Sequence, residues 1–215
     1  MKPKRIILVR HGQSAGNVDK RVYNKQPDYS VPLTDLGVKQ AYDAGRELRL
    51  LLGDETVGIY TSPYYRTRGT TEQIVRHINP VFIREDLRLR EHEWTGQLVD
   101  DDKLAWEAKG IEYGITFFRF PTGESVADVY NRICTFYLDL REEFKSKIYP
   151  KNLIIVGHGM TNRVLLTRIL GLKVEEFELL KNPKNGQYFI LDQNTRGEYK
   201  LSHTIETREK LKRLW

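Results

Sequence analysis

The chain has 215 residues, of which 40% are hydrophobic and 30% are charged, and its net charge is +6. This composition excludes a disordered chain and suits one folded unit, so we expect a single domain over residues 1–215. The apolar run after the basic N-terminus covers only residues 6–9, which excludes a signal peptide or membrane helix there. The single cysteine, Cys134, excludes an intramolecular disulfide and a multi-cysteine metal site. We therefore expect a cytoplasmic protein without a membrane partner.

The excess of positive charge fits either ordinary surface solubility or an anionic ligand. The densest basic cluster, residues 208–213, lacks the interleaved aromatic residues that are typical of nucleic-acid binding. We therefore expect no nucleic-acid partner, and the charge alone does not decide between the other two interpretations.

Apolar runs alternate with helical patterns along the chain, which predicts an α/β layer fold. The first run, residues 5–9, is continuous and β-branched, as is typical of a central parallel strand buried on both faces. Further strands are expected at residues 57–61, 80–84, 153–156 and 187–191, and an edge strand at residues 198–202.

Four helices are expected between these strands. The first covers residues 35–52, with Thr34 as its cap and Gly53 at its end. The second begins at Ser62 and Pro63, a cap followed by proline at the first helical position. The third begins near residues 123–125, and the fourth covers about residues 160–170.

Residues 97–122 fit no strong period and carry three phenylalanines, Phe117, Phe118 and Phe120. We expect this segment to be a lid or insertion that rests on another part of the molecule.

Charged and nucleophilic residues follow the predicted strands. His11 comes after the strand at residues 5–9, and His158 comes after the strand at residues 153–156. In open α/β sheets the ligand crevice lies at the carboxyl ends of the strands, so we expect the two imidazoles at one rim. Arg66 would lie one turn into a helix whose N-terminus favours anions, and Glu91 follows the strand at residues 80–84.

These residues, together with Arg10, suit a phosphorylated ligand. Guanidinium forks form paired, charge-assisted hydrogen bonds with phosphate, and a neutral imidazole can attack phosphorus. Each residue taken alone has a structural explanation as well, since histidines at strand ends often serve only as hydrogen-bonding groups. Their joint placement at strand ends favours the catalytic interpretation.

Residues 8–17, LVRHGQSAGN, resemble the signature of the histidine phosphatase superfamily, the cofactor-dependent phosphoglycerate mutase-like family. Further family motifs are matched by PLTDLG at residues 32–37, SPYYRT at 62–67, LRE at 89–91, PTGES at 121–125 and VGHG at 156–159. The resemblance covers about residues 5–172, and residues 173–215 carry no such motif. It implies a three-layer α/β/α sandwich around a mostly parallel sheet.

The resemblance also implies roles. His11 would be the nucleophile that becomes phosphohistidine, and Glu91 would be the general acid and then the general base. The positions implied to bind the ligand are Arg10, Gly12, Gln13, Asn17, Arg66, His158 and Gly159. Because cationic side chains would neutralise the transition-state charge, we expect no cofactor and no metal. A backbone carbonyl is expected to fix the proton on the non-attacking ring nitrogen of His11.

A metal site built from His11, His158 and Glu91 is the competing interpretation of the same cluster. Positive charges nearby would oppose a cation, and the spacing lacks a recognised zinc pattern.

The family contains both phosphatases and mutases. Its mutase pattern has a tyrosine shortly after the acid and an adjacent arginine pair, whereas here Trp94 stands in place of the tyrosine. The arginines between residues 97 and 145 are isolated from one another: Arg119, Arg132 and Arg141. This favours a phosphomonoester hydrolase. A phosphoglycerate mutase-type phosphotransferase is the first alternative, and a non-catalytic phospho-ligand binding module is the second.

The expected partner is a small phosphorylated substrate. The loop at residues 18–31 and the predicted lid at residues 97–122 would give its pocket cations and aromatic walls. Neither the identity of the substrate nor the oligomeric state follows from these features.

Overall fold

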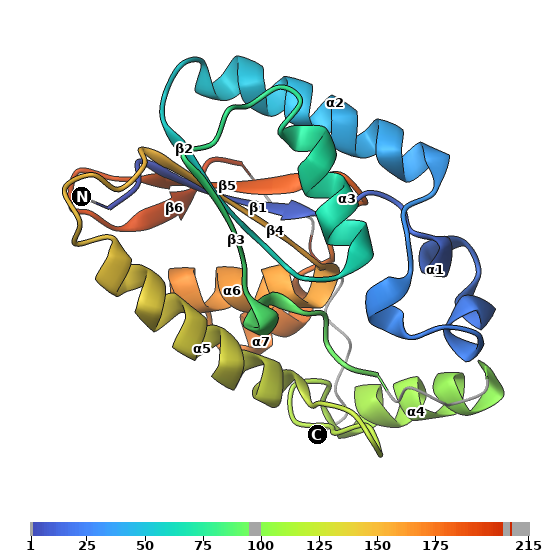
Figure 1. The fold of residues 1–215 in the computed structure, drawn as a ribbon. Coiled ribbons are helices and arrows are strands. Elements are labelled where there is room, and N and C mark those ends of the chain that lie inside the picture. The colour runs from blue at the N-terminus through green and yellow to red at the C-terminus, as the bar shows by residue number, and fades with distance from the viewer. Residues whose placement is uncertain (1, 95–99, 204–206, 208–215) are drawn as a thin grey trace.

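The structure is a computed structural model that describes residues 2–94, 100–203 and 207. Within these residues six strands form one sheet in the order β3-β2-β4-β1-β5-β6 (Figure 1). The strands are β1 (Arg5–Arg10), β2 (Val57–Thr61), β3 (Phe82–Glu85), β4 (Asn152–Gly157), β5 (Tyr188–Gln193) and β6 (Tyr199–Leu201).

The sheet is mostly parallel, as expected. β1, β2, β3 and β4 run in the same direction, whereas β5 pairs antiparallel with β1 and β6 pairs antiparallel with β5. All six predicted strands are present. β3 begins at Phe82, two residues later than predicted from the sequence. Pro80 has no amide hydrogen to donate to β2, so the first amide of this segment that pairs with β2 is that of Val81, which donates to the Val57 carbonyl at 2.8 Å.

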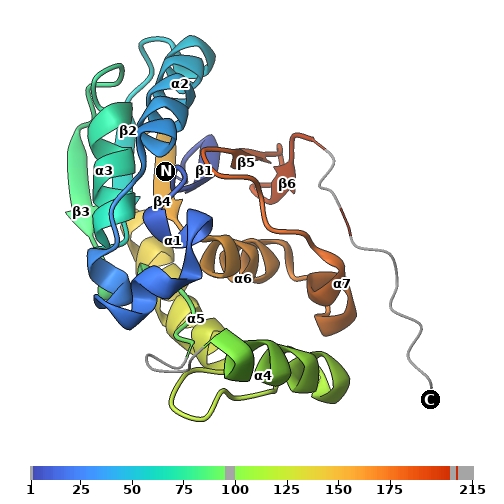
Figure 2. The same cartoon turned by 90° about the vertical axis from the view of Figure 1, so that its right-hand side faces the viewer.

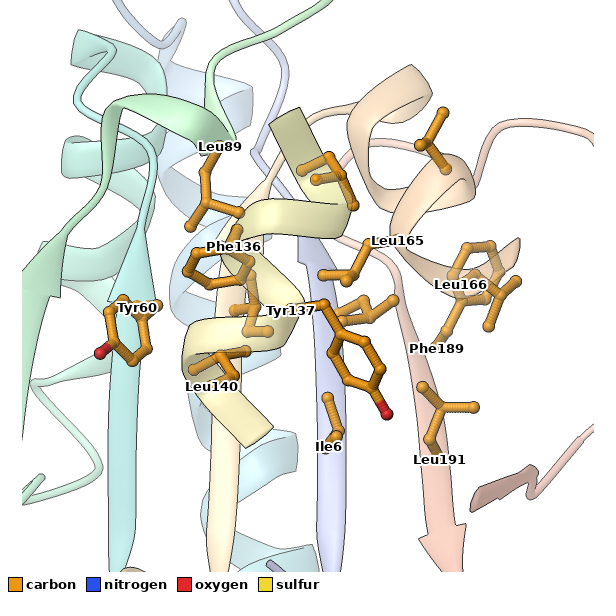
Figure 3. Close-up of a cluster of buried hydrophobic side chains, with 14 of the residues drawn as sticks. Ile6, Tyr60, Leu89, Phe136, Tyr137, Leu140, Leu165, Leu166, Phe189 and Leu191 are labelled. Carbon is orange, nitrogen blue, oxygen red and sulfur yellow. The ribbon is translucent and has the colours of Figure 1, made fainter. Parts of the chain in front are cut away.

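Helices cover both faces of the sheet, which confirms the three-layer α/β/α fold. Side chains of β1 alternate between the layers: Ile7 and Val9 pack in the cluster on the side of α2 (Asp35–Leu52) and α3 (Tyr65–Ile74). Ile6 and Leu8 pack in the cluster with α5 (Val126–Glu143) and α6 (Gly159–Leu170), part of which Figure 3 shows. The run of apolar residues in β1 is continuous because both of its faces are covered.

Two helix starts confirm predictions and one corrects a prediction. The Thr34 hydroxyl accepts from the Gly37 amide at 3.1 Å at the start of α2. Ser125 and Asp128 form a capping box at the start of α5. The helix predicted to begin at Ser62 instead begins at Tyr65. The Ser62 hydroxyl contacts the Nε2 atom of His158, at 2.8 Å, and does not cap the helix.

The segment predicted as a lid contains a helix, α4 (Asp100–Tyr113), which the weak sequence period did not reveal. Residues 97–99 of the predicted lid lie outside the described residues. The Trp106 and Phe118 rings lie 6.1 Å apart and the Phe118 and Phe120 rings 5.4 Å apart, so aromatic contacts hold α4 to the following chain. α4 and α2 lie at opposite ends of the molecule (Figures 1 and 2). The role of this segment as a lid stays a prediction.

Shorter elements connect the layers. They are α1 (Ala15–Val18), α7 (Val174–Leu179) and the 3-10 helices η1 (Lys20–Asn24), η2 (Asp28–Ser30) and η3 (Leu87–Leu89). None of the helices among the described residues combines the length and the apolar character that crossing a membrane requires.

Candidate active site

His11 and His158 follow the carboxyl ends of two adjacent parallel strands. Arg10 and Gly157, the residues just before them, are register partners in β1 and β4. The two imidazole rings therefore meet, with centroids 5.2 Å apart, and both side chains are buried. The carboxyl end of β1 points toward α1, which follows it in the chain (Figure 1).

The tautomer of His11 follows from its backbone contact. The Nδ1 atom lies 2.6 Å from the carbonyl oxygen of Gly12. A carbonyl oxygen can only accept a hydrogen bond, so Nδ1 carries the proton and the lone pair is on Nε2. The expected backbone carbonyl is thus present, and Nε2 is the nitrogen that can act as a nucleophile.

His158 is held from two sides. Its Nε2 atom contacts the hydroxyl of Ser62 at 2.8 Å, and the Tyr64 ring lies 5.1 Å from its own ring. Its Nδ1 atom is buried and has no hydrogen-bond partner within the described part of the chain. A buried polar nitrogen without a partner is costly, which makes Nδ1 a candidate ligand-facing atom.

Both histidines are uncharged near neutral pH. Burial lowers the pKa of His11 well below its ordinary value, and the charges of Arg66 and Arg10 lower it further. Burial also lowers the pKa of His158 well below its ordinary value, with Arg66 again adding to the effect. A neutral imidazole keeps the lone pair that nucleophilic attack needs.

Two arginines bring positive charge to these rings. Arg66, at the start of α3, is 3% exposed and pairs with Asp28. The Nη1 atom of Arg10 donates to the carbonyl oxygen of Pro183 at 2.6 Å. The Nε atom of Arg10 is buried and unpartnered among the described residues. The site therefore holds guanidinium donors that an anion could bind.

Glu91 lies at the N-terminus of α6, the helix that begins one residue after His158. Its carboxylate accepts from the backbone amides of Met160 and Thr161, at 3.3 and 3.2 Å. The Thr161 hydroxyl donates to the same carboxylate at 3.1 Å. These contacts place a carboxylate beside the second histidine.

A partly buried ion network supports the Glu91 segment. Arg132 donates to the backbone carbonyl of Glu91 at 3.1 Å and to the carboxylate of Glu124 at 2.9 and 3.0 Å. Arg90 reaches the Glu124 carboxylate from the other side, at 2.5 Å. Burial alone would raise the pKa of Glu124, but Arg132 outweighs it and the pKa is lowered. Glu124 is therefore a structural anion that binds two arginines.

Asn17 is oriented by three donors. Its Oδ1 atom accepts from the amide and the hydroxyl of Ser14, at 3.1 and 3.2 Å. It also accepts from the Nδ2 atom of Asn185, at 2.9 Å. With its oxygen used in this way, the amide nitrogen of Asn17 remains a donor, and it has no partner in the part of the chain that the structure describes.

The other predicted ligand-binding positions hold the loop in shape. The Gly12 amide donates to the hydroxyl of Thr70 at 3.0 Å, so it is not free for a ligand. The Gln13 side-chain oxygen accepts from Thr34 at 2.9 Å. A Cβ on Gly159 would come within 2.9 Å of Asn182, so this glycine permits close packing.

Residues 182–186, which we call the C-terminal strap, belong to the site although the sequence did not reveal them. Asn185 donates to the backbone carbonyl of His11 at 3.1 Å as well as to Asn17. The Gly186 amide donates to the carbonyls of Arg10 and His11, both at 3.2 Å. Gly186 has a φ of 76°, a conformation that favours glycine. The turn-forming composition of the strap, NPKNG, is the signal that could have drawn attention to it.

Three further residues contact the site and were not predicted from the sequence to do so: Asp28, Ser62 and Tyr64.

Within residues 2–94, 100–203 and 207, no group of three or more His, Cys, Asp or Glu residues is placed to hold a metal ion.

Known proteins resemble this chain over most of its length. A phosphoglycerate mutase-like protein of Arabidopsis thaliana, AT74H, is 36% identical over 93% of this chain and 77% of its own. Phosphoserine phosphatase 1 of Hydrogenobacter thermophilus is 30% identical over 80% of this chain and 79% of its own. The relatives therefore include both phosphatases and mutase-like proteins.

The fold recurs in a solved structure of mycobacterial glucosyl-3-phosphoglycerate phosphatase with VO3. Its TM-score is 0.76 at 22% identity, and the match covers 94% of this chain and 99% of that chain. The family model of the histidine phosphatase superfamily (branch 1) matches residues 6–205. The sequence motifs, the strand-end histidines and this match agree, and the chain belongs to the histidine phosphatase superfamily.

Proposed function

We propose that this protein is a phosphomonoester hydrolase that works through a phosphohistidine on His11. One observation carries the proposal: the buried, neutral imidazole of His11 has its proton held on Nδ1 by the Gly12 carbonyl and its Nε2 lone pair free. The ring also lies beside the ring of His158, and the positive charges of Arg66 and Arg10 help to lower its pKa. That arrangement is the one an attack on phosphorus requires.

In the first step the Nε2 atom of His11 attacks phosphorus, and the bond between phosphorus and the leaving oxygen breaks. Glu91, protonated at this stage, gives its proton to the leaving oxygen, which departs as an alcohol. Arg10 and Arg66 neutralise the charge on the phosphoryl oxygens, and His158 and the Asn17 amide supply further hydrogen bonds. Positioning and charge neutralisation supply most of the catalysis in phosphoryl transfer.

In the second step a water molecule attacks phosphorus and the nitrogen–phosphorus bond breaks. The Glu91 carboxylate takes the proton from this water, which restores the starting protonation state. Inorganic phosphate then leaves, and Nε2 of His11 regains its lone pair, while Nδ1 keeps its proton throughout.

The contacts of the arginines favour hydrolysis over mutase activity. A mutase must hold a second anionic group while the phosphoryl group moves, and this needs free cations. Arg132 binds Glu124 at 2.9 Å, and Arg119 binds Asp128 at 2.6 Å. Both arginines are therefore committed to carboxylates of the protein itself. Trp94, in place of the tyrosine of the mutase pattern, has no hydroxyl to offer.

The substrate is proposed to be a small phosphomonoester whose alcohol lies near the phenol of Tyr23. Tyr23, from η1, packs its phenol against Gly16 in α1, where a Cβ would collide with the phenol oxygen. Burial raises the pKa of Tyr23, and the charges of Arg66, Glu91 and Arg10 all act on its hydroxyl. This phenol is therefore a neutral group at the edge of the proposed phosphate pocket.

The test is a phosphate-release screen of the purified protein against a broad panel of phosphomonoesters. A coupled assay for interconversion of 3- and 2-phosphoglycerate is run beside it. We expect phosphate release from at least one monoester to exceed any interconversion. Interconversion well above release would assign a mutase, and tight binding without turnover of any phosphomonoester would assign a binding module.

A further inference from the structure

Asp28 contacts Arg66, the proposed phosphate ligand, and it belongs to none of the sequence motifs on which the family resemblance rests. Its carboxylate accepts from Nη1 and Nη2 of Arg66, at 2.8 and 3.3 Å, and its backbone carbonyl accepts from Nη1 at 2.7 Å. The side chain of Arg66 is 3% exposed and that of Asp28 is 35% exposed. One residue of η2 thus makes three hydrogen bonds to a nearly buried guanidinium.

A count of the donors shows what these bonds leave free. A guanidinium has five N–H groups in a fixed plane: one on Nε and two on each terminal nitrogen. Asp28 takes both hydrogens of Nη1 and one of Nη2. The remaining two, on Nε and Nη2, lie side by side on one edge, and neither has a partner among the residues that the structure describes.

This free edge has the geometry that binds an oxyanion. Elsewhere in the chain the same pair of atoms holds a carboxylate: Arg68 binds Glu85 through Nε and Nη2, at 2.7 and 2.6 Å. A phosphate offers oxygens at a similar spacing, and paired contacts of this kind are short and charge-assisted.

The Arg66 guanidinium is covered on one face and at one end. The Tyr64 ring lies against one face, with its centroid 4.8 Å from the Cζ atom of Arg66, and it also contacts the ring of His158. Asp28 closes the end formed by Nη1 and Nη2. A guanidinium held in this way cannot turn within its plane or tilt out of it without breaking these contacts.

We propose that Asp28 is a positioning residue, which holds Arg66 by its end so that the Nε and Nη2 edge faces the phosphoryl group. The inference rests on the proposed role of Arg66 as a phosphate ligand. Through Asp28, η2 and the loop at residues 18–31 that contains it would contribute to the phosphate pocket. Fixed donors stabilise a transition state better than mobile ones do, because their orientation costs nothing at the moment of reaction.

The opposite interpretation is that Asp28 competes with phosphate for Arg66. Under that interpretation a substrate would have to displace the carboxylate, and removing it would tighten phosphate binding without loss of turnover. The donor count favours positioning, because Asp28 leaves a complete two-donor edge available. The two interpretations predict opposite changes in phosphate affinity, so one series of variants separates them.

The experiment compares wild type with Asp28→Ala, Asp28→Asn, Arg66→Ala and the double variant of Asp28→Ala with Arg66→Ala. Calorimetric binding of inorganic phosphate and kcat and KM on p-nitrophenyl phosphate are measured for each. We expect Asp28→Ala to lower kcat by about ten- to hundredfold and to weaken phosphate binding at least about threefold. Asp28→Asn keeps an oxygen that can accept from Nη1, so it should recover a large part of the loss.

The double-variant cycle tests whether Asp28 acts through Arg66. If it does, adding Asp28→Ala to Arg66→Ala should change kcat and phosphate affinity by less than about twofold. Independent, additive losses would overturn the proposal, and so would tighter phosphate binding with unchanged kcat in Asp28→Ala. If Asp28→Ala does not fold, Asp28→Leu, which also removes both carboxylate oxygens but keeps a side chain of similar size, replaces it in the cycle.

Asp54→Ala is the matched control, because Asp54 also pairs with an arginine, Arg49, at 2.7 Å but is 95% exposed. It should match wild type in every measurement. The phosphate-binding readout keeps this test separate from the proposed function. A wild type that binds phosphate without hydrolysing any ester would reject the hydrolase, while the Asp28 series would still be decided by binding alone.

Discussion

His11 and His158 reach the site from the ends of adjacent strands, whereas the C-terminal strap reaches it from the far end of the chain. The histidines offer side-chain nitrogens and are buried by the sheet and its helices. The strap offers a carbonyl to Arg10 and an amide to Asn17, and it covers the loop after β1. The strand ends thus hold the groups proposed to react, and the strap holds those groups in place. The two regions should therefore respond to substitution by very different amounts.

Replacing His11 with Ala should have the largest effect. Without the nucleophile no phosphohistidine can form, so we expect turnover of p-nitrophenyl phosphate to fall by about 10,000-fold or more. Wild type, quenched without acid after brief incubation with labelled substrate, should carry alkali-stable, acid-labile label on His11. His203→Ala, at an exposed histidine, is the control and should keep its activity. Label on a serine, or turnover intact in His11→Ala, would contradict the mechanism.

Glu91→Gln should come next, and its effect should depend on the leaving group. The amide cannot protonate a leaving oxygen or activate water, so an alkyl phosphate should lose about 100- to 10,000-fold in rate. p-Nitrophenolate leaves without protonation, so its release should suffer much less and should appear as a burst while phosphoenzyme accumulates. Glu93→Gln is the matched control two residues away. Equal losses for both substrates without a burst would show that Glu91 is structural.

The strap is tested by Asn185→Ala. This change removes one of the three donors that orient the Asn17 amide, and we expect kcat to fall by about tenfold with little change in thermal stability. If the strap acts through Asn17, combining this change with Asn17→Ala should add almost nothing to the loss in Asn17→Ala. A loss as large as that of His11→Ala would show that the strap takes part in the chemistry itself.

The free energy of unfolding should decrease as the pH drops below the ordinary histidine pKa of about 6.5. Burial lowers the pKa of His11, His158 and His92 in the folded chain. Below the ordinary histidine pKa of about 6.5 the unfolded chain binds protons that the folded chain does not, so the free energy of unfolding decreases. Each such histidine contributes about 1.4 kcal/mol per pH unit until its folded pKa is reached.

Urea denaturation between pH 7.5 and 5 measures this slope. His158→Gln should reduce this slope by about the contribution of one proton. Glu55, whose pKa is lowered to about 2 by Lys4 and Asn152, loses its contribution only in more acid solution and does not interfere. Constant stability across this range would mean that the buried rings accept protons in the folded state.

Chelation should have the smallest effect of all. Because Arg10 and Arg66 are proposed to neutralise the phosphoryl charge, with His158 as a hydrogen-bond partner, EDTA should change phosphate release by less than about twofold. Loss of activity in EDTA that one divalent metal restores would reject this division of roles.

Much of the fold and the reacting groups could be predicted from sequence because they depend on local patterns. The continuous apolar run of β1, the Thr34 cap and the stripe of α5 each follow from neighbouring residues. His11 and His158 lie at predicted strand ends, and parallel strands bring such ends to one rim. The order of residues along the chain was therefore enough to place both imidazoles at one rim, whereas the adjacency of β1 and β4, which brings the rings together, was set by the strand order of the sheet.

The supporting contacts were decided by tertiary structure alone. Arg10 and Pro183 are 173 residues apart, and Asn17 and Asn185 are 168 apart, so no local period could pair them. Ser62 has the residue type of a helix cap, but its hydroxyl binds His158, which only the packed sheet brings within reach. Local sequence specified which groups could react, because caps, periods and strand ends depend on near neighbours. Packing specified how those groups are held, because a hydrogen bond between distant segments exists only after the layers have closed around them.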